Sequence, residues 1–231
     1  MDYDRRDNVP GVNRNGDFNT LYSGSFAISS LHTYVKQLLH IRNNRNDYMK
    51  IVGPSLNETE AEDSWYNMCM QSLFQPSDYL KHYLNPYLEV FSRHTVLGIH
   101  IRSGSSANWR DPDFHITKEI IEMEFDRINE ILTKSKDPLI FLASDSDELQ
   151  QVIKSRFGDI VFSVSGLDKQ HVGKFSTQSG LLRAVMELHL LGQCDYLLLT
   201  KPSGFGDCGR RLNAKNPPFW YFQTGDEKIT F

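Results

Sequence analysis

Apolar residues in the first third of the chain recur at spacings of three and four. The pattern is clear from Phe26 to His40, and it returns over residues 65–73 and 77–93. This period is typical of helices that bury one face. Ser77 is the expected N-cap of the last of these helices, which we expect to continue past Pro86. The sequence therefore predicts a mainly helical N-terminal region.

After residue 94, short apolar runs rich in β-branched residues replace the helical period. The first run, Thr95–Arg102, has the composition of a strand buried on both faces. Further along, the expected elements are a helix at 117–134, a strand at 139–143, a helix at 147–157, a strand at 160–162, a helix from about 176 to 190, a strand at 196–199, a loop at 202–206, a last helix and a strand at 219–221. Strands that alternate with helices favour right-handed crossovers, so we predict an α/β fold with a doubly wound, mainly parallel sheet.

Three regions follow from these patterns. Residues 1–25 are polar and without period, which indicates a loose N-terminal arm. Residues 26–94 form the helical N-terminal region, and residues 95–231 form the α/β domain. A chain of 231 residues suffices for one large domain, or for one domain with a smaller partner.

Charge and cysteine content narrow the class of protein. Lys and Arg number 25 against 29 Asp and Glu, a net charge of -4 with neutral His, which disfavours nucleic acid and favours a small molecule or a protein as partner. The three cysteines lie far apart, so neither a zinc site nor a dense disulfide framework is indicated. The sequence shows no signal-like or membrane-spanning segment. We therefore expect a cytoplasmic protein by default, or a protein of the Golgi or ER lumen if the sequence is a fragment.

The first expected strand ends in two residues suited to an anion. His100 and Arg102 stand two positions apart, so in an extended strand they point to the same face. A guanidinium matches a phosphate with two parallel hydrogen bonds, and residues 103–106 add backbone N–H groups and hydroxyls. The alternative is a buried Arg paired with a carboxylate, beside a core His that is bonded to the backbone. Ligands of such sheets bind outside the carboxyl ends of the strands, so we expect the strand-end loops to converge on one site.

The second expected strand ends in an Asp-x-Asp pair formed by Asp145 and Asp147. Such a pair could hold Mg²⁺ or Mn²⁺ on a diphosphate. The interpretation we favour places Asp147 and Glu148 in the first turn of a helix, where acidic side chains stabilise the exposed N–H groups. We therefore predict no metal site.

The third expected strand leads to Ser203, Gly204 and Phe205 before a helix. Their amides and the Ser203 hydroxyl could cradle a phosphate at the positive end of that helix. The segment is not a P-loop, because the Gly-x-x-x-x-Gly-Lys spacing is absent. In the preceding helix Glu187 and Arg183 stand one turn apart and could pair on the surface.

Three segments together resemble the superfamily of GDP-fucose-dependent glycosyltransferases, which includes α1,6-fucosyltransferases, the Nod-factor fucosyltransferase and protein O-fucosyltransferases. The segments are Val96–Arg102, Phe141–Ser146 and Glu187–Phe205. Their order and separation are more specific than any one of them. The resemblance covers about residues 76–220, and it implies the Rossmann-like donor lobe of a GT-B fold with residues 26–94 as a reduced acceptor lobe.

The resemblance implies roles for the first two strand ends. Arg102 matches an arginine that contacts the diphosphate, His100 matches a histidine beside the nucleotide, and Asp145 matches a strand-end aspartate. Departure of GDP leaves negative charge on the β-phosphate, so Arg102 is the expected catalytic residue. Members of this kind invert the sugar centre and use no metal or other cofactor.

The resemblance also implies the remaining contacts with the donor. Glu187 stands where the family has an aspartate that accepts hydrogen bonds from guanine. Ser203, Gly204 and Phe205 match the phosphate-binding loop, with Gly204 in place of a hydroxyl residue. GDP-fucose is therefore the expected donor partner.

The expected activity is transfer of fucose from GDP-fucose to a hydroxyl of a glycan or protein acceptor. Two alternatives stay open: a noncatalytic nucleotide-sugar-binding domain or fragment, and a transferase that uses another nucleotide sugar. The sequence shows no clear general base, since Asp111, Asp113 and His115 have the setting of a solvated loop. Trp109 could stack on a sugar or anchor that loop.

Overall fold

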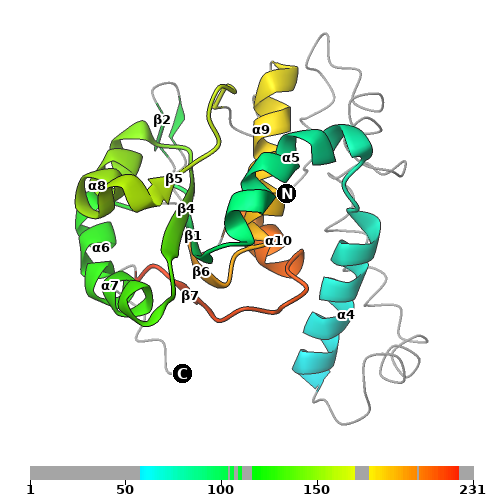
Figure 1. Ribbon diagram of the computed structural model, residues 1–231. Coiled ribbons are helices and arrows are strands. Elements are labelled where there is room, and N and C mark those ends of the chain that lie inside the picture. Colours follow the sequence, from blue (N-terminus) through cyan, green and yellow to red (C-terminus); the bar gives the residue numbers. More distant parts are fainter. Residues whose placement is uncertain are drawn as a thin grey trace. The chain divides into compact units, whose positions relative to one another are not determined.

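The computed structural model describes residues 58–103, 105–106, 109–110, 116–169, 177–201 and 203–223 (Figure 1). The expected arm, the expected helix at 26–40 and the loop residues Asp111, Asp113 and His115 lie outside these residues. The chain divides into two units, Met1–His82 and Tyr83–Phe231. The domain boundary between residues 94 and 95 stays a prediction.

Two helices confirm the helical pattern that the sequence shows over residues 65–73 and 77–93. They are α4 (Glu58–Leu73) and α5 (Asp78–Phe91), and α5 contains Pro86. Ser77 precedes α5 as predicted: its Oγ accepts a hydrogen bond of 3.3 Å from the backbone N–H of Leu80. The amino end of α5 is therefore capped by its own sequence.

A parallel sheet of five strands forms the centre of the second unit. In spatial order its strands are β5 (Val161–Phe162), β4 (Pro138–Ser144), β1 (Thr95–Ile101), β6 (Tyr196–Leu199) and β7 (Phe219–Tyr221). Every neighbouring pair is parallel. The chain thus runs outward from β1 through β4 to β5, returns to the other side of β1 as β6, and ends at β7. This arrangement confirms the predicted doubly wound α/β fold, and its switch point lies between β1 and β6.

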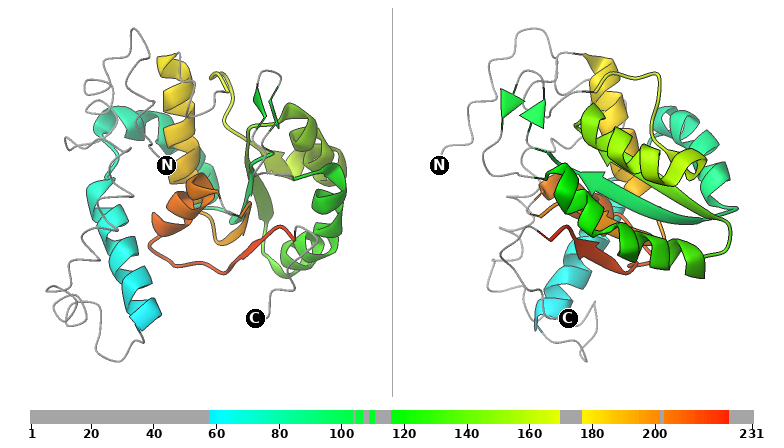
Figure 2. Two further views of the ribbon diagram at one scale, coloured as in Figure 1. Left: turned by 180° about the vertical axis from the view of Figure 1, so that it is seen from behind. Right: turned by 90° about the vertical axis from the view of Figure 1, so that its left-hand side faces the viewer.

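Helices cover both faces of this sheet. Figures 1 and 2 show α6 (Lys118–Met123), α7 (Phe125–Lys134) and α8 (Asp147–Phe157) on one face, and α9 (Gln178–Leu191) and α10 (Gly204–Arg211) on the other. The core between the sheet and the first group is almost entirely aliphatic, with Ile99, Ile101, Ile121, Ile128, Ile140, Leu142, Ile153 and Leu198 as its most buried members. A short 3₁₀ turn, Gly158–Ile160, joins α8 to β5.

Several predicted bounds differ from the observed ones, including those of β1, which ends at Ile101, and of β4, which is one residue longer at each end. The segment expected as one helix at 117–134 is two helices, with buried Glu124 between them; the Glu124 carboxylate accepts a hydrogen bond of 3.2 Å from the Trp220 indole. The strand expected at 160–162 begins one residue later. The loop expected at 202–206 ends early, since α10 begins at Gly204.

Two short antiparallel strands, β2 (Ser105–Ser106) and β3 (Trp109–Arg110), follow β1. They fall in the segment where the sequence predicted a loop. None of the helices within the described residues is both long and apolar enough to cross a membrane.

Candidate functional site

The ends of β1 and β6 are joined by one threonine side chain. Thr200 follows β6, and its Oγ1 accepts a hydrogen bond of 3.0 Å from the backbone N–H of Arg102. The same hydroxyl donates a hydrogen bond of 3.0 Å to the backbone carbonyl of His100. Thr200 is 1% exposed, so this bridge lies in the interior at the switch point.

A carboxylate joins the ends of β1 and β4 in a similar way. The Arg102 guanidinium donates through Nη1 to Oδ2 of Asp145 at 2.7 Å. The backbone N–H and the hydroxyl of Ser103 both donate to Oδ1 of Asp145, each at 2.9 Å. Three hydrogen bonds thus fix the Asp145 carboxylate against the two residues that follow β1.

Arg102 combines the two arrangements that the sequence left open. It lies at the carboxyl edge of the sheet, where a ligand is expected, and it is also paired with a carboxylate. The side chains of Arg102 and Asp145 are 12% and 20% exposed, so the ion pair reaches the surface of the edge. Because β1 ends at Ile101, strand alternation does not decide the direction of the Arg102 side chain.

His100 packs against the first turn of α10. Its ring stacks on the ring of Phe205, with centroids 5.2 Å apart and planes 24° apart. A Cβ added to Gly206 would lie 2.9 Å from His100 Nδ1, so the imidazole approaches the α10 backbone closely. Among the described residues Nδ1 has no hydrogen-bond partner, so this atom does not fit the alternative of a core His bonded to the backbone.

The charge state of His100 follows from its burial. Burial lowers the pKa of His100 to about 4; the nearby Arg102 adds to this effect, and Asp145 opposes it. The ring is therefore neutral near pH 7. It brings a dipole and a flat apolar surface to the site rather than a positive charge.

The first turn of α10 lies next to this bridge. Ser203 is the N-cap of α10, and its backbone N–H donates to the carbonyl of Thr200 at 3.0 Å. Ser203 is buried, Gly204 is exposed and Phe205 is half-buried. The N–H groups at this helix start carry a partial positive charge that attracts anions.

Glu187 lies apart from the strand ends, in the middle of α9. Arg183 donates through Nε to Glu187 Oε1 at 2.8 Å and through Nη1 to the Leu167 carbonyl at 3.0 Å. The alternative of a pair on the surface was wrong, since the two side chains are only 7% and 10% exposed. The pair is buried because α9 turns apolar residues inward on both sides of it, namely Leu182, Val185, Met186 and Leu190.

Burial also changes the acidity of Glu187. It raises the pKa of Glu187 to about 7, although Arg183 and Lys169 lower it; the charge of Asp145 raises it further. Asp145 is thus one of the charged groups that act on Glu187. At neutral pH the group is poised between a carboxylic acid and a carboxylate.

Asp145 and Asp147 both contact cationic side chains of the protein. Asp145 pairs with Arg102. Asp147, which lies in the first turn of α8, accepts a hydrogen bond from the Lys169 ammonium. Ser146 is the N-cap of α8, and its Oγ accepts from the Leu149 N–H at 3.2 Å. The described residues hold no group of three His, Cys, Asp or Glu side chains suited to a metal ion.

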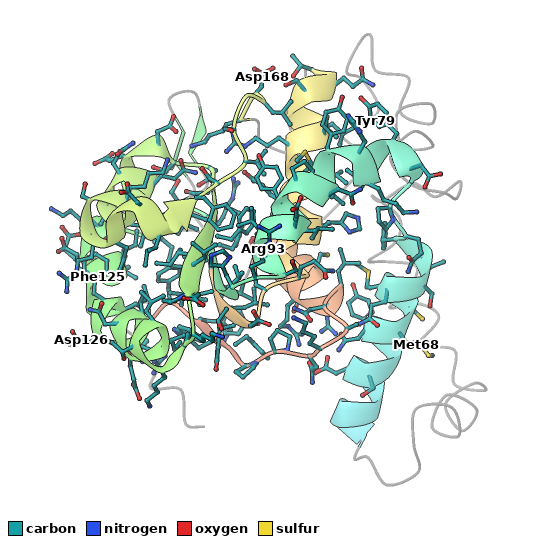
Figure 3. The ribbon with its side chains drawn as sticks, in the orientation of Figure 1. Met68, Tyr79, Arg93, Phe125, Asp126 and Asp168 are labelled. Carbon is teal, nitrogen blue, oxygen red and sulfur yellow. The ribbon has the colours of Figure 1, made fainter. Side chains whose placement is uncertain are left out.

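The loop before α9 is fastened to the start of that helix. Thr177 Oγ1 donates to Asp168 Oδ2 at 3.0 Å, and the Asp168 N–H donates to Ser179 Oγ at 3.0 Å (Figure 3). Leu167 therefore has a defined place from which its carbonyl accepts from Arg183.

The structure therefore brings together most of the predicted site residues. His100, Arg102 and Asp145 are linked to Ser203 and Phe205 by direct contacts or through Thr200. Sequence reasoning missed Thr200 and the role of Ser103. A hydroxyl residue directly after the apolar strand 196–199 was the available signal for Thr200.

The fold and this edge define an α/β protein with a Rossmann-like sheet and a polar site at its switch point. No protein-family model and no curated protein matches the chain. Solved structures do. NodZ alpha-1,6-fucosyltransferase co-crystallized with GDP is 23% identical with a TM-score of 0.46, over 65% of this chain and 45% of that chain. NodZ from Bradyrhizobium is 22% identical with a TM-score of 0.46, over 66% and 46%.

Two further structures extend this comparison. POFUT1 in complex with GDP is 16% identical with a TM-score of 0.42, over 68% of this chain and 51% of that chain. A mutant of Arabidopsis thaliana FUT1 in complex with GDP is 16% identical with a TM-score of 0.45, over 68% and 35%. The chain thus spans about half the length of these proteins or less. At these identities the likeness concerns the fold, and function rests on the side chains of the site.

Proposed function

We propose that the carboxyl edge of β1, β4 and β6 binds the diphosphate of a nucleotide sugar. One observation carries the proposal: Thr200 connects the Arg102 backbone to the Ser203 N–H at the start of α10. A guanidinium and a helix N-terminus are thereby held at the same edge. Both favour an anion, and their positions are set before any ligand arrives.

We propose GDP-fucose as the nucleotide sugar, and transfer of fucose to a hydroxyl of a glycan or protein as the reaction. The sequence motifs that resemble GDP-fucose-dependent glycosyltransferases support this choice. As the bond from fucose to GDP breaks, negative charge grows on the β-phosphate. Arg102 and the α10 amides would stabilise that charge without a metal ion, and the acceptor would attack from the opposite face and invert the sugar centre.

In this proposal Asp145 orients Arg102 within the donor site. A carboxylate in direct contact with a diphosphate would repel it, whereas the ion pair with Nη1 holds the guanidinium plane in one direction. His100 and Phe205 form an apolar stack beside the phosphate-binding turn of Ser203 and Gly204.

Glu187 is the proposed acceptor for the N–H groups of guanine. Its Oε1 already accepts a hydrogen bond from Arg183, one turn earlier in α9, and this bond holds the Glu187 side chain in place. Guanine offers adjacent N–H donors on one edge, whereas uracil has a single ring N–H donor. We therefore expect preference for GDP over UDP.

The ion pair between Arg102 and Asp145 favours a second candidate function. Asp145 offsets part of the positive charge that departure of GDP would require, so the edge would suit a noncatalytic nucleotide-sugar-binding domain. The two candidates differ in turnover and agree in binding.

Calorimetry with GDP, UDP and ADP, followed by a GDP-fucose turnover assay, tests the proposal. Arg102→Ala is expected to lower turnover about 100-fold or more, the usual effect of removing a preorganised charge-stabilising group. The matched control is Arg93→Ala, because Arg93 also pairs with a carboxylate, Glu89, but is exposed and precedes β1 (Figure 3).

Three outcomes of this experiment are decisive. Near-normal turnover by folded Arg102→Ala protein would contradict the catalytic role of Arg102. GDP that binds no better than UDP would remove the guanine assignment. Binding of GDP without any turnover of GDP-fucose would select the noncatalytic candidate.

A further inference from the structure

The strands β1 and β6 separate toward their carboxyl ends. Their backbone pairing ends at Ile99 with Leu198, although both strands continue beyond that point. At a switch point neighbouring strands lead to connections on opposite faces of the sheet. The hydroxyl of Thr200 continues the pairing past the end of the backbone ladder.

This hydroxyl satisfies two backbone groups at once. It accepts from the Arg102 N–H and donates to the His100 carbonyl, each at 3.0 Å. Thr200 and His100 are 1% and 5% exposed, which leaves little room for water to take over these bonds. Loss of the hydroxyl would therefore leave a donor and an acceptor unpaired in the interior.

The bridge restrains Arg102 from the side opposite Asp145. Asp145 fixes the guanidinium from the β4 side, whereas Thr200 fixes the Arg102 backbone from the β6 side. The Thr200 carbonyl also accepts from the Ser203 N–H, so one residue contacts both Arg102 and the start of α10.

We propose that Thr200 is a positioning residue of the donor site, which sets Arg102 and the first turn of α10 at the spacing that a diphosphate requires. The proposal rests on the proposed donor function of this edge. Thr200 itself touches no substrate, because its hydroxyl is committed to backbone groups. The effect of its hydroxyl on binding and turnover passes through Arg102, whereas its backbone carbonyl holds the Ser203 N–H.

The test compares two substitutions in the full chain. Thr200→Val keeps the β-branched shape and loses the hydroxyl, whereas Thr200→Ser keeps the hydroxyl. Thr200→Val is expected to weaken GDP binding about tenfold, the equivalent of one net hydrogen bond, and to lower GDP-fucose turnover. Thr200→Ser is expected to restore most of both. Thr133→Val is the control, because the Thr133 hydroxyl donates to a backbone carbonyl on the exposed part of α7.

A double-mutant cycle separates positioning from general destabilisation. In the Arg102→Ala background Thr200→Val is expected to cause little further loss of GDP affinity, because Thr200 acts through Arg102. If Thr200 has only a structural role, Thr200→Val is expected to lower GDP affinity as much in the Arg102→Ala background as in the wild type. If Thr200→Val protein does not fold, Thr200→Cys, whose thiol bonds more weakly than the hydroxyl, replaces it in the same cycle.

Hydrogen exchange of the Arg102 amide, followed by NMR without ligand, gives a readout that is independent of GDP. Faster exchange is expected in Thr200→Val protein than in the wild type and in Thr133→Val protein. Wild-type protein that fails to bind GDP would overturn the proposed function together with the donor-site role of Thr200. GDP binding that is the same in wild-type and Thr200→Val protein would overturn the Thr200 proposal alone.

Discussion

At the scale of single residues, the site at the ends of β1, β4 and β6 depends on the hydrogen bonds that each of its polar atoms makes. Asp145 accepts from Arg102 and from both donors of Ser103, so its carboxylate is held by three hydrogen bonds. His100 is the exception, because its buried Nδ1 lacks a partner among the described residues. An unpaired polar atom inside a protein carries a free-energy cost, which is commonly tolerated at functional sites.

The protonation of Glu187 is coupled to the stability of the fold. Burial raises its pKa in the folded chain to about 7, above the usual value of 4.5 for this group. A carboxyl group whose pKa is raised by folding stabilises the folded state fully at low pH, and this contribution disappears as the pH rises through the folded pKa. Arg183, Lys169 and Asp145 are the charged groups that act on it.

We therefore predict that Glu187→Gln changes the pH dependence of unfolding. Between about pH 5 and pH 7 the free energy of unfolding of the wild type should fall relative to that of the Gln variant, which cannot ionise. Urea denaturation at several pH values measures this difference. Glu122→Gln, on the exposed part of α6, is the control and should run parallel to the wild type. A parallel course for Glu187→Gln would show that the folded pKa is not raised.

At the scale of elements, boundaries were predictable where local chemistry sets them. The bounds of α8, β6 and β7 agree with the prediction because capping residues and short apolar runs mark their ends. The break between α6 and α7 at Glu124 was not predictable, because the apolar period of Ile121, Phe125 and Ile128 continues across it. The start of α10 was missed because Gly-rich segments are also typical of loops.

Two glycines in the first turn of α10 make a matched pair. A Cβ at Gly206 would lie 2.9 Å from His100 Nδ1, whereas a Cβ at Gly204 would meet nothing within 4 Å. We predict that Gly206→Ala lowers the free energy of unfolding by about 1–3 kcal/mol, because the buried imidazole must shift. Gly204→Ala should not lower it, since Ala favours a helix over Gly by about 0.5–1 kcal/mol. Urea denaturation of both variants measures these values, and equal effects would contradict the close packing of α10 on His100.

At the scale of the whole molecule, the order of the five strands decides where the site lies. Because β6 returns to the free side of β1, the connections after these two strands leave in opposite directions. The groups at their ends meet there, although Arg102 and Thr200 are separated by 98 residues in the chain. A ligand at this edge would therefore contact segments that only the complete sheet brings together.

Ligand binding at the edge should stabilise the folded chain. GDP at 100 times its dissociation constant is expected to raise the free energy of unfolding by about 2.7 kcal/mol, by mass action alone. Thermal or urea unfolding with GDP and with UDP measures the effect. Arg102→Ala should reduce the stabilisation by GDP, and Arg93→Ala should leave it unchanged. Equal stabilisation by GDP and UDP at the same concentration would argue against recognition of guanine.

The sequence by itself determined the alternation of helices and strands and the residues at the strand ends. It did so because hydrophobic period and capping are local, and because the carboxyl ends of parallel strands share one edge. The motifs also carried the resemblance to GDP-fucose-dependent glycosyltransferases. Only the tertiary structure decided the partners: Asp145 for Arg102, 43 residues away, and Thr200 as the bridge between strands. It also decided the burial of Glu187 with Arg183. Partner choice and burial depend on which segments become neighbours in the fold, and spacing along the chain does not carry that information.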